Sequence, residues 1–246
     1  MPLLTPVRRR GHEILDAPDV DPALVERSLR DVALANRLFG GARAVLAELA
    51  PLFATLAARG GEATLLDVGT GLGDIPAAAR AAAARRGLAL RTVGLDAAEE
   101  LARACRGRTD LSLCASALAL PLRSSSVDVV TCSQVLHHFA DADARLLIAE
   151  MHRVARVAVV ISDLRRGWAP AAGIWLASFP LGFHPVSRHD GVVSVLRGFT
   201  GAELRDHVRA ATGRTPRIAH HPIARVTASW TTGNTTLGGT VSPGGA

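Results

Sequence analysis

At 246 residues, the chain is long enough for one domain with a full core and a small appendage. Its apolar fraction of 48% excludes a disordered protein, and all 28 positive residues behind the net charge of +6 are arginines. The absence of lysine excludes a Walker A phosphate loop and lysine Schiff-base chemistry, and the absence of both tyrosine and lysine excludes the Tyr/Lys pair of short-chain dehydrogenases.

Charge and cysteine content also limit which binding partners and which cellular compartment are expected. The arginines are spread along the chain and aromatic residues make up only 4%, so nucleic-acid binding is the weaker interpretation. Three scattered cysteines, Cys105, Cys114 and Cys132, suit neither a disulfide framework nor a zinc site. They favour a reducing compartment, and we expect a cytoplasmic protein, a monomer or homodimer without a membrane span.

Residues 1–61 are predicted to form a helical N-terminal cap, with helical character over 12–58. Asp21 is an expected N-cap, and Pro22 stands at the first helical position. Gly40 and Gly41 interrupt the apolar periodicity, so a second helix is expected from 42 to 59.

From residue 62 onward, short apolar runs alternate with helical segments. The expected strands are 64–68, 90–96, 111–115, 127–133 and 157–163, and the expected helices are 74–86, 97–105 and 141–154. This alternation predicts an α/β fold of the Rossmann-like kind, with a seven-stranded, mostly parallel sheet and helices on both faces.

The last third of the chain is less regular. Residues 164–199 are apolar but interrupted by proline and glycine, and they show no clear helical or strand periodicity. Thr200 and Glu203 predict a capping box and a helix to about 212, and two closing strands are expected in 216–230. The main domain is therefore placed at 62–230, and 231–246 is expected to be a disordered tail.

A glycine-rich turn follows the first expected strand. Asp67 is followed by Gly69, Gly71 and Gly73, which let the chain turn tightly and let a ligand approach the backbone. Asp96 ends the next strand, where a carboxylate can accept hydrogen bonds from both hydroxyls of a ribose. The spacing G-x-G-x-G after an acid differs from the G-x-G-x-x-G of dinucleotide-binding proteins.

These residues resemble the first motif of class I S-adenosylmethionine-dependent methyltransferases, in the group that modifies small molecules and precursors of ubiquinone and menaquinone. Residues 117–122, 126–130 and 135–139 resemble further stretches of that group, so the resemblance covers about 62–164. It implies that S-adenosylmethionine is the cofactor, that Asp67 lies near its methionine portion, and that Asp96 holds its ribose. The implied cofactor-binding residues are Asp67, Gly69, Thr70, Gly71, Gly73, Asp96, Ser116, Ala117, Ser133 and Gln134.

Two positions depart from the family pattern. Ser116 stands where the family has an acid that contacts the adenine amine, and its hydroxyl can still form a hydrogen bond there. The Pro-Gly-Gly turn before the fifth strand is missing, because residues 153–156 run almost directly into that strand.

The candidate catalytic residues are His137, His138 and Asp163. All three follow strands at the carboxyl edge of the sheet, where open α/β sheets bind ligands. Methyl transfer needs in-line placement and removal of the acceptor's proton, and histidine accepts protons near neutral pH. The alternative is that the His-His pair caps a helix and packs there.

The resemblance implies that residues 164–199 form a lid over the acceptor of the methyl group. This lid supplies the candidate substrate-binding residues, namely Trp175, Phe183, His184 and His189. Polar groups among aromatic side chains could orient a phenol or carboxylate in an apolar pocket, whereas the alternative is a surface loop in which a His-Asp pair caps a helix. No metal site is predicted, since His220 and His221 have no carboxylate or cysteine near them in the sequence.

The sequence thus predicts transfer of a methyl group to oxygen or carbon of a hydrophobic small molecule, such as a phenolic polyketide or a quinone precursor. Two alternatives remain open. One is a protein that binds S-adenosylmethionine but has been catalytically repurposed, and the other is an RNA or protein methyltransferase.

Overall fold

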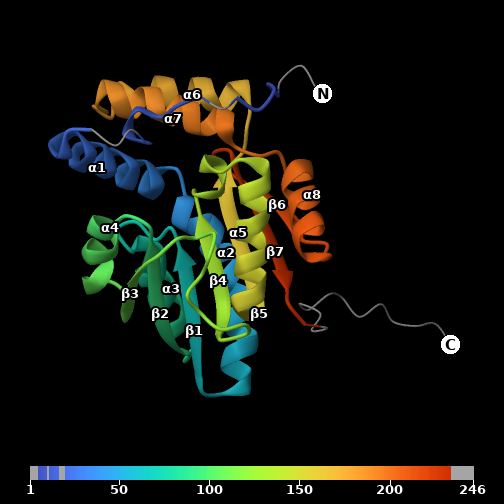
Figure 1. The fold of residues 1–246 in the computed structure, drawn as a ribbon. Coiled ribbons are helices and arrows are strands. Elements are labelled where there is room, and N and C mark those ends of the chain that lie inside the picture. Colours follow the sequence, from blue (N-terminus) through green and yellow to red (C-terminus); the bar gives the residue numbers. More distant parts are fainter. Residues whose placement is uncertain (1–4, 10, 17–19, 234–246) are drawn as a thin grey trace.

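The structure, a computed structural model, describes residues 5–9, 11–16 and 20–233. A seven-stranded sheet with the order β3-β2-β1-β4-β5-β7-β6 forms its centre (Figure 1). Strands β1 to β5 run parallel, and β7 is antiparallel to both of its neighbours. The predicted α/β fold with a mostly parallel sheet is confirmed. The strands are β1 (Glu62–Val68), β2 (Ala89–Asp96), β3 (Leu111–Cys114), β4 (Val127–Ser133), β5 (Ala155–Leu164), β6 (Arg217–His221) and β7 (Arg225–Thr231).

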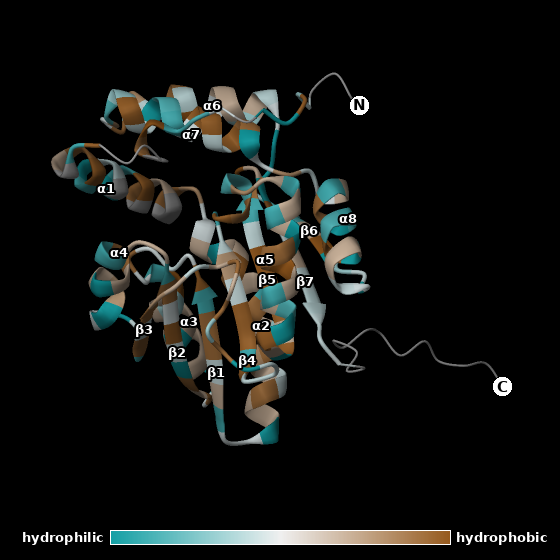
Figure 2. Ribbon diagram, viewed as in Figure 1, coloured by the Kyte–Doolittle hydropathy of each residue, from teal (hydrophilic) through white to brown (hydrophobic). Residues whose placement is uncertain are grey.

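Helices cover both faces of the sheet. On one face, α2 (Gly41–Arg59) and α3 (Asp74–Ala84) enclose a core that includes Leu49, Phe53 and Leu65. On the other face, α5 (Asp141–Val154) and α8 (Gly201–Thr212) enclose a second core. Helix α4 (Glu99–Ala104) contacts β2 and β3 at one end of the sheet. Figure 2 shows apolar residues along the central strands, which agrees with burial of the sheet on both sides.

Helix α2 belongs to this sheet layer and not to a separate N-terminal unit. By length and composition alone it could cross a membrane, but here it packs against α3, β5 and β7. Its Glu48 carboxylate, only 5% exposed, accepts hydrogen bonds from Thr227 and Ser229 on β7 and from Arg217 on β6. The predicted boundary between a cap and a main domain at residue 61 therefore does not coincide with a change of layer.

A second layer of helices lies above the edge at which the parallel strands end (Figure 1). It consists of α1 (Pro22–Leu38), α6 (Trp168–Ser178) and α7 (Pro185–Arg197), together with the short 3₁₀ turn η2 (Ile14–Asp16). Helix α7 contacts α6, α1 and η2, so the start of the chain and the segment after β5 form one cover.

Segment 164–199 is more regular than its proline and glycine content suggests, because most of it is helical. Pro170 lies in the first turn of α6, where its missing N–H is not needed, and Pro180 and Gly182 lie between the two helices. The predicted helix over 12–20 is reduced to η2 among the residues that are described. Residues 234–246, most of the predicted tail, lie outside the described residues.

Other local predictions are confirmed. Asp21 caps α1, and Pro22 opens it. Thr200 and Glu203 form the reciprocal capping box of α8. In chain order the first strands extend from β1 toward β3 and the later ones from β4 in the opposite direction, so the order reverses between β1 and β4. Ligands of such sheets bind outside the carboxyl ends at this reversal, which is where the glycine turn lies.

Candidate active site

The turn between β1 and α3 has its glycines in left-handed backbone conformations. The φ angles are 70° at Gly69, 53° at Gly71 and 76° at Gly73. The N–H groups of Gly69 and Thr70 both donate to the carbonyl of Leu95 on β2, at 2.8 and 3.0 Å, and this fixes the turn. A Cβ placed on Gly71 would meet no atom within 4 Å, so open space lies beside the backbone here. A ligand can therefore approach the chain at the start of α3.

Asp96 closes this turn from the end of β2. Its Oδ2 accepts a hydrogen bond from the N–H of Gly71 at 3.0 Å, and its Oδ1 accepts one from the N–H of Ala98 at 3.1 Å. The side chain is only partly buried. Asp96, at the end of β2, is thus hydrogen-bonded directly to the glycine turn that follows β1.

Asp67 is buried at the end of β1, with 1% of its surface exposed. Burial raises the pKa of its carboxyl group to about 7, in spite of a 2.7 Å hydrogen bond that Oδ1 accepts from the Thr131 hydroxyl. Repulsion from the carboxylates of Asp74 and Asp96 adds to this rise of the pKa. This acid therefore carries a proton part of the time at neutral pH.

The remaining predicted cofactor residues lie on the loops after β3 and β4. Ser116 is exposed, and its Oγ accepts a hydrogen bond from the N–H of Leu118; Ala117 is partly buried. The Oγ of Ser133 is buried and has no hydrogen-bond partner among the described residues. Gln134 has a left-handed φ of 58°, which is strained for a residue with a side chain.

S-Adenosylmethionine fits this edge of the sheet. The open space beside Gly71 accommodates a ligand against the backbone, and the carboxylate of Asp96 lies next to it. The unsatisfied hydroxyl of Ser133 offers a hydrogen bond that the protein does not itself complete.

His137 and Asp163 form a buried pair beyond the end of β4. His137 belongs to the 3₁₀ turn η4 (Leu136–His138), and Asp163 lies on β5. The Nδ1 atom of His137 is 2.6 Å from Oδ1 of Asp163, and the backbone N–H of His137 donates to Oδ2 at 3.0 Å. Burial alone would raise the pKa of Asp163, but the His137 ring and its hydrogen bond lower it below the ordinary value. The carboxylate therefore fixes the ring and directs Nε2 away from itself.

A cavity of about 530 Å³ lies between this pair and the helical cover. Its floor includes Gln134, His137 and His138, and its walls come from α1, α6, α7 and the turn before β7. Apolar side chains such as Phe39, Ile174 and Phe183 line much of it. Its size and mixed lining are those of a site for a small organic molecule.

One wall of the cavity is Glu13, which sequence reasoning missed. Its side chain is 8% exposed, and Oε1 accepts hydrogen bonds from Ser194 at 2.8 Å and from Arg197 at 3.0 Å. The carboxylate of Asp190 holds this segment by accepting from the N–H groups of Ile14 and Leu15. No signal in the sequence connects residue 13 with α7, because the contact depends on how the chain returns over the sheet.

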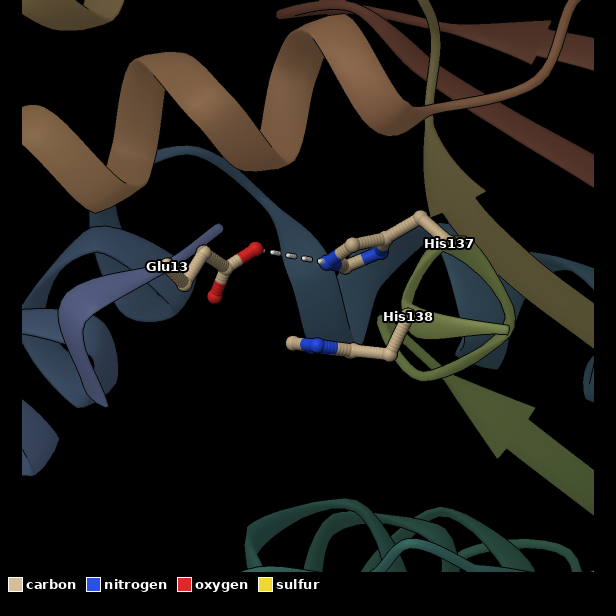
Figure 3. A group of neighbouring side chains, drawn as sticks. All are labelled: Glu13, His137 and His138. Atoms are coloured by element: carbon tan, nitrogen blue, oxygen red, sulfur yellow. Dashed lines mark ion pairs between the residues drawn. The ribbon is translucent and has the colours of Figure 1, made fainter. Parts of the chain in front are cut away.

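Glu13 faces both histidines (Figure 3). Its Oε1 is 3.9 Å from Nε2 of His137, and the ligand atoms of Glu13, His137 and His138 all lie within 4.8 Å of one another. The rings of the two histidines are tilted, with their centroids 4.3 Å apart. His137 is buried, whereas His138 is exposed. Both predicted histidines therefore border the cavity, although they are neighbours in the chain.

Arg225, at the start of β7, is a second functional candidate that the sequence did not reveal. It is 3% exposed and lines the cavity. Burial lowers the pKa of its guanidinium to about 10, and the charge of Asp163 partly offsets that effect. A buried cation at the cavity wall favours an acceptor that carries partial negative charge.

The predicted substrate residues divide into two groups. Phe183 is buried and lines the cavity. Trp175, His184 and His189 do not line it: the Trp175 side chain is exposed on α6, and His189 is exposed next to Asp190. His184 is the N-cap of α7, where its Nδ1 accepts from the N–H of Val186. Because this segment is helical, these three side chains lie outside the cavity lining.

The comparison by sequence finds methyltransferases. A family described as "Methyltransferase domain" matches residues 66–160, which include the glycine turn, β4 and His137 and end before Asp163. A curated relative is the tRNA (carboxymethyluridine(34)-5-O)-methyltransferase ALKBH8 of Mus musculus, 38% identical over 68 residues. That match covers 27% of this chain and 10% of the relative, so the chain spans only a small part of the length of ALKBH8.

Solved structures share the whole fold at low identity. A SAM-dependent methyltransferase from Aquifex aeolicus superimposes with a TM-score of 0.57 and 17% identity, over 87% of this chain and 99% of that one. Magnesium protoporphyrin IX methyltransferase (ChlM) from Synechocystis PCC 6803, solved with bound SAH, gives a TM-score of 0.51 and 15% identity, over 87% and 89%.

Proposed function

We propose that the chain is a class I S-adenosylmethionine-dependent methyltransferase that methylates oxygen or carbon of a hydrophobic small molecule, of the phenolic, polyketide or quinone-precursor class. The observation that carries this proposal is the cavity of about 530 Å³ that adjoins the predicted cofactor edge. Gln134 lines that cavity and directly follows Ser133, so the acceptor and cofactor sites meet at the end of β4.

The bound cofactor supplies an electrophilic methyl group, and the residues of the chain position its acceptor. His137 offers Nε2 to the cavity, while Asp163 holds Nδ1 and stabilises the charge that the ring gains if it accepts a proton. Arg225 favours the acceptor in its anionic form. The helical cover places Phe183 and Ile174 at the cavity wall, so the acceptor meets an apolar surface there.

The first experiment measures cofactor binding. Calorimetry with S-adenosylmethionine and S-adenosylhomocysteine is expected to give micromolar dissociation constants, of the order of metabolite binding. In Gly71→Arg the new side chain fills the open space, and binding is expected to be lost.

A matched control is Gly87→Arg. Gly87 follows α3 at the other end of that helix, has a φ of 70°, and likewise has no atom within 4 Å of an added Cβ. It carries the same backbone strain away from the glycine turn, so it should bind the cofactor normally. Loss of binding in both variants, or in neither, would contradict the assignment of the turn.

The acceptor site is tested on helix α6. Gly173 lines the cavity, and a Cβ there would meet no neighbour, so Gly173→Phe should extend into the cavity. We expect the KM for a phenolic or quinone acceptor to rise about tenfold or more, while cofactor affinity stays unchanged. Ala172→Phe, on the same helix but exposed and not part of the lining, is the control. If no acceptor of a broad phenolic and quinone panel gains a methyl group although the cofactor binds, a repurposed cofactor-binding protein is the better description.

RNA methylation is a second candidate, which the local similarity to ALKBH8 and the net charge of +6 favour. It predicts an affinity for RNA that falls steeply with salt, because phosphate contacts release counterions. Labelled methyl transfer to total tRNA, measured beside the small-molecule panel, separates the two. Methylation of tRNA with none of the small molecules would overturn the small-molecule proposal.

A further inference from the structure

We propose that Glu13, His137 and His138 bind a divalent transition-metal ion, with Zn²⁺ as the reference case, at the wall of the acceptor cavity (Figure 3). The inference rests on the proposed function, since it assigns the ion to the acceptor site. It also narrows the acceptor to molecules with a hydroxyl or enol oxygen that can coordinate a metal.

The donor set is the first reason. Two imidazole nitrogens and a carboxylate oxygen all lie within 4.8 Å of one another. This set is the one that catalytic zinc sites use when they keep a coordination position open, and non-haem iron sites use it as well. Small movements of the exposed His138 side chain suffice to bring the atoms to coordination distance, since only Glu13 and His137 are buried.

The surroundings of His137 are the second and independent reason. Histidines that bind metals almost always donate their other ring N–H to a carboxylate, which fixes the tautomer and makes the free nitrogen a better ligand. Asp163 occupies that position, 2.6 Å from Nδ1, and is fully buried. The lone pair of Nε2 is thereby directed toward Glu13, 3.9 Å away.

Glu13 is also held as a ligand would be. Ser194 and Arg197 both donate to its Oε1, and Asp190 anchors the backbone one and two residues further on. These contacts fix the carboxylate at the cavity wall, with Oε1 as the oxygen that lies 3.9 Å from Nε2 of His137. A hydrogen-bonded carboxylate in such a shell is typical of metal sites, whereas a structural ion pair with Arg197 alone would not need the two imidazoles beside it.

The open coordination position faces the cavity, because all three residues line it. An acceptor oxygen bound there would lose its proton more readily, as metal-bound water does. The transfer then breaks the S–CH₃ bond of the sulfonium, returns the electron pair to sulfur, forms the O–CH₃ bond and releases the hydroxyl proton to solvent. With Nε2 occupied by the ion, His137 acts as a ligand and not as the proton acceptor.

The test uses the full chain, freed of metal with a chelator and titrated with Zn²⁺ by calorimetry and with Co²⁺ by visible absorption. One ion per chain is expected, with cobalt d–d bands of a site with fewer than six ligands. Glu13→Gln and His138→Ala should each weaken Zn²⁺ binding by about 100-fold or more, and Asp163→Asn by about 10- to 100-fold. His12→Gln, an exposed histidine next to Glu13, should bind like the wild type.

A measurement of S-adenosylmethionine binding distinguishes failure of the metal site from failure of the proposed function. Wild type and Glu13→Gln should bind S-adenosylmethionine equally, with or without chelator, because the glycine turn contains none of the metal ligands. Normal cofactor binding with no Zn²⁺ or Co²⁺ binding would overturn the metal site and leave the proposed function standing. Equal metal affinity in wild type, Glu13→Gln and His138→Ala would overturn it as well. If a variant fails to fold, the wild-type cobalt spectrum decides, and the six-coordinate spectrum of the aqueous ion counts against the site.

Discussion

At the scale of single residues, the unusual feature of the predicted cofactor site is that Asp67, the acid at the end of β1, is buried. Asp67 accepts a hydrogen bond from the Thr131 hydroxyl, and its pKa is about 7 because burial opposes the charge. The resemblance to methyltransferases implies that the positively charged methionine portion of the cofactor lies nearby. Binding of that cation would favour the carboxylate, so the pKa of Asp67 should fall on binding.

Proton release therefore should accompany cofactor binding. We expect S-adenosylmethionine to bind more tightly as the pH rises from about 6 to about 8, with release of up to one proton, in calorimetry repeated in buffers of different ionisation enthalpy. The stability of the ligand-free protein changes with pH in the opposite direction. Because the pKa of this carboxyl group is raised from 3.8, its contribution to the free energy of unfolding falls as the pH rises from about 4 to about 7. Asp67→Asn should remove both dependences, and an unchanged pH profile in this variant would contradict the assignment.

At the scale of elements, Glu48 ties α2 to the antiparallel end of the sheet. Burial opposes ionisation of this side chain, but hydrogen bonds from Ser229 and Thr227 and the charge of Arg217 lower the pKa below the ordinary value. A helix and two strands distant in sequence thus share one carboxylate. The sequence gives no sign of this, since a glutamate in an alanine-rich helix is normally a surface residue.

Glu48→Gln tests this connection. The neutral amide keeps one acceptor and introduces donors that face other donors, so we expect a loss of about 1–3 kcal/mol in the free energy of unfolding. Because the folded pKa is lowered, the contribution is present at neutral pH and is lost as the pH falls through 4.5 and below. Denaturant titrations at pH 7 and pH 4 should therefore differ less in the variant than in the wild type. Glu26→Gln, on the exposed surface of α1, serves as the control.

At the scale of the whole molecule, the cofactor edge and the acceptor cavity are built differently. Asp67, Gly71 and Asp96 lie on neighbouring strands and their helix, so periodicity and glycine spacing identify them from the sequence. The cavity joins the first residues of the chain to α7 and β7, and residues such as Glu13 and Arg225 carry no local pattern. The sequence predicts His137 and Asp163 because both follow strands, but it does not reveal that helices α6 and α7 carry Trp175 and His189 outside the cavity lining.

Because the glycine turn is formed locally and the cavity wall is not, we expect that a substitution can weaken acceptor binding without changing cofactor affinity. In Asp190→Ala the N–H groups of Ile14 and Leu15 lose a charged acceptor, which costs about 1.5–3 kcal/mol for each hydrogen bond. We expect faster trypsin cleavage at Arg8 and Arg9 and a higher KM for the acceptor, with unchanged affinity for S-adenosylmethionine. Asp206→Ala, on the exposed side of α8, should change none of these. Parallel loss of cofactor affinity in Asp190→Ala would show that the sites are coupled.

The anchoring of Glu13 also has a consequence for synthesis on the ribosome. Its partners Ser194 and Arg197 lie 181 and 184 residues further along, whereas Gly71 and Asp96 are separated by 25. The cofactor turn can close while most of the chain is still to be made, because its parts leave the exit tunnel together. Glu13 leaves the tunnel well before α7 is translated, so its contacts with Ser194 and Arg197 can form only afterwards. The cavity wall that joins Glu13 to α7 is therefore completed later in synthesis than the glycine turn.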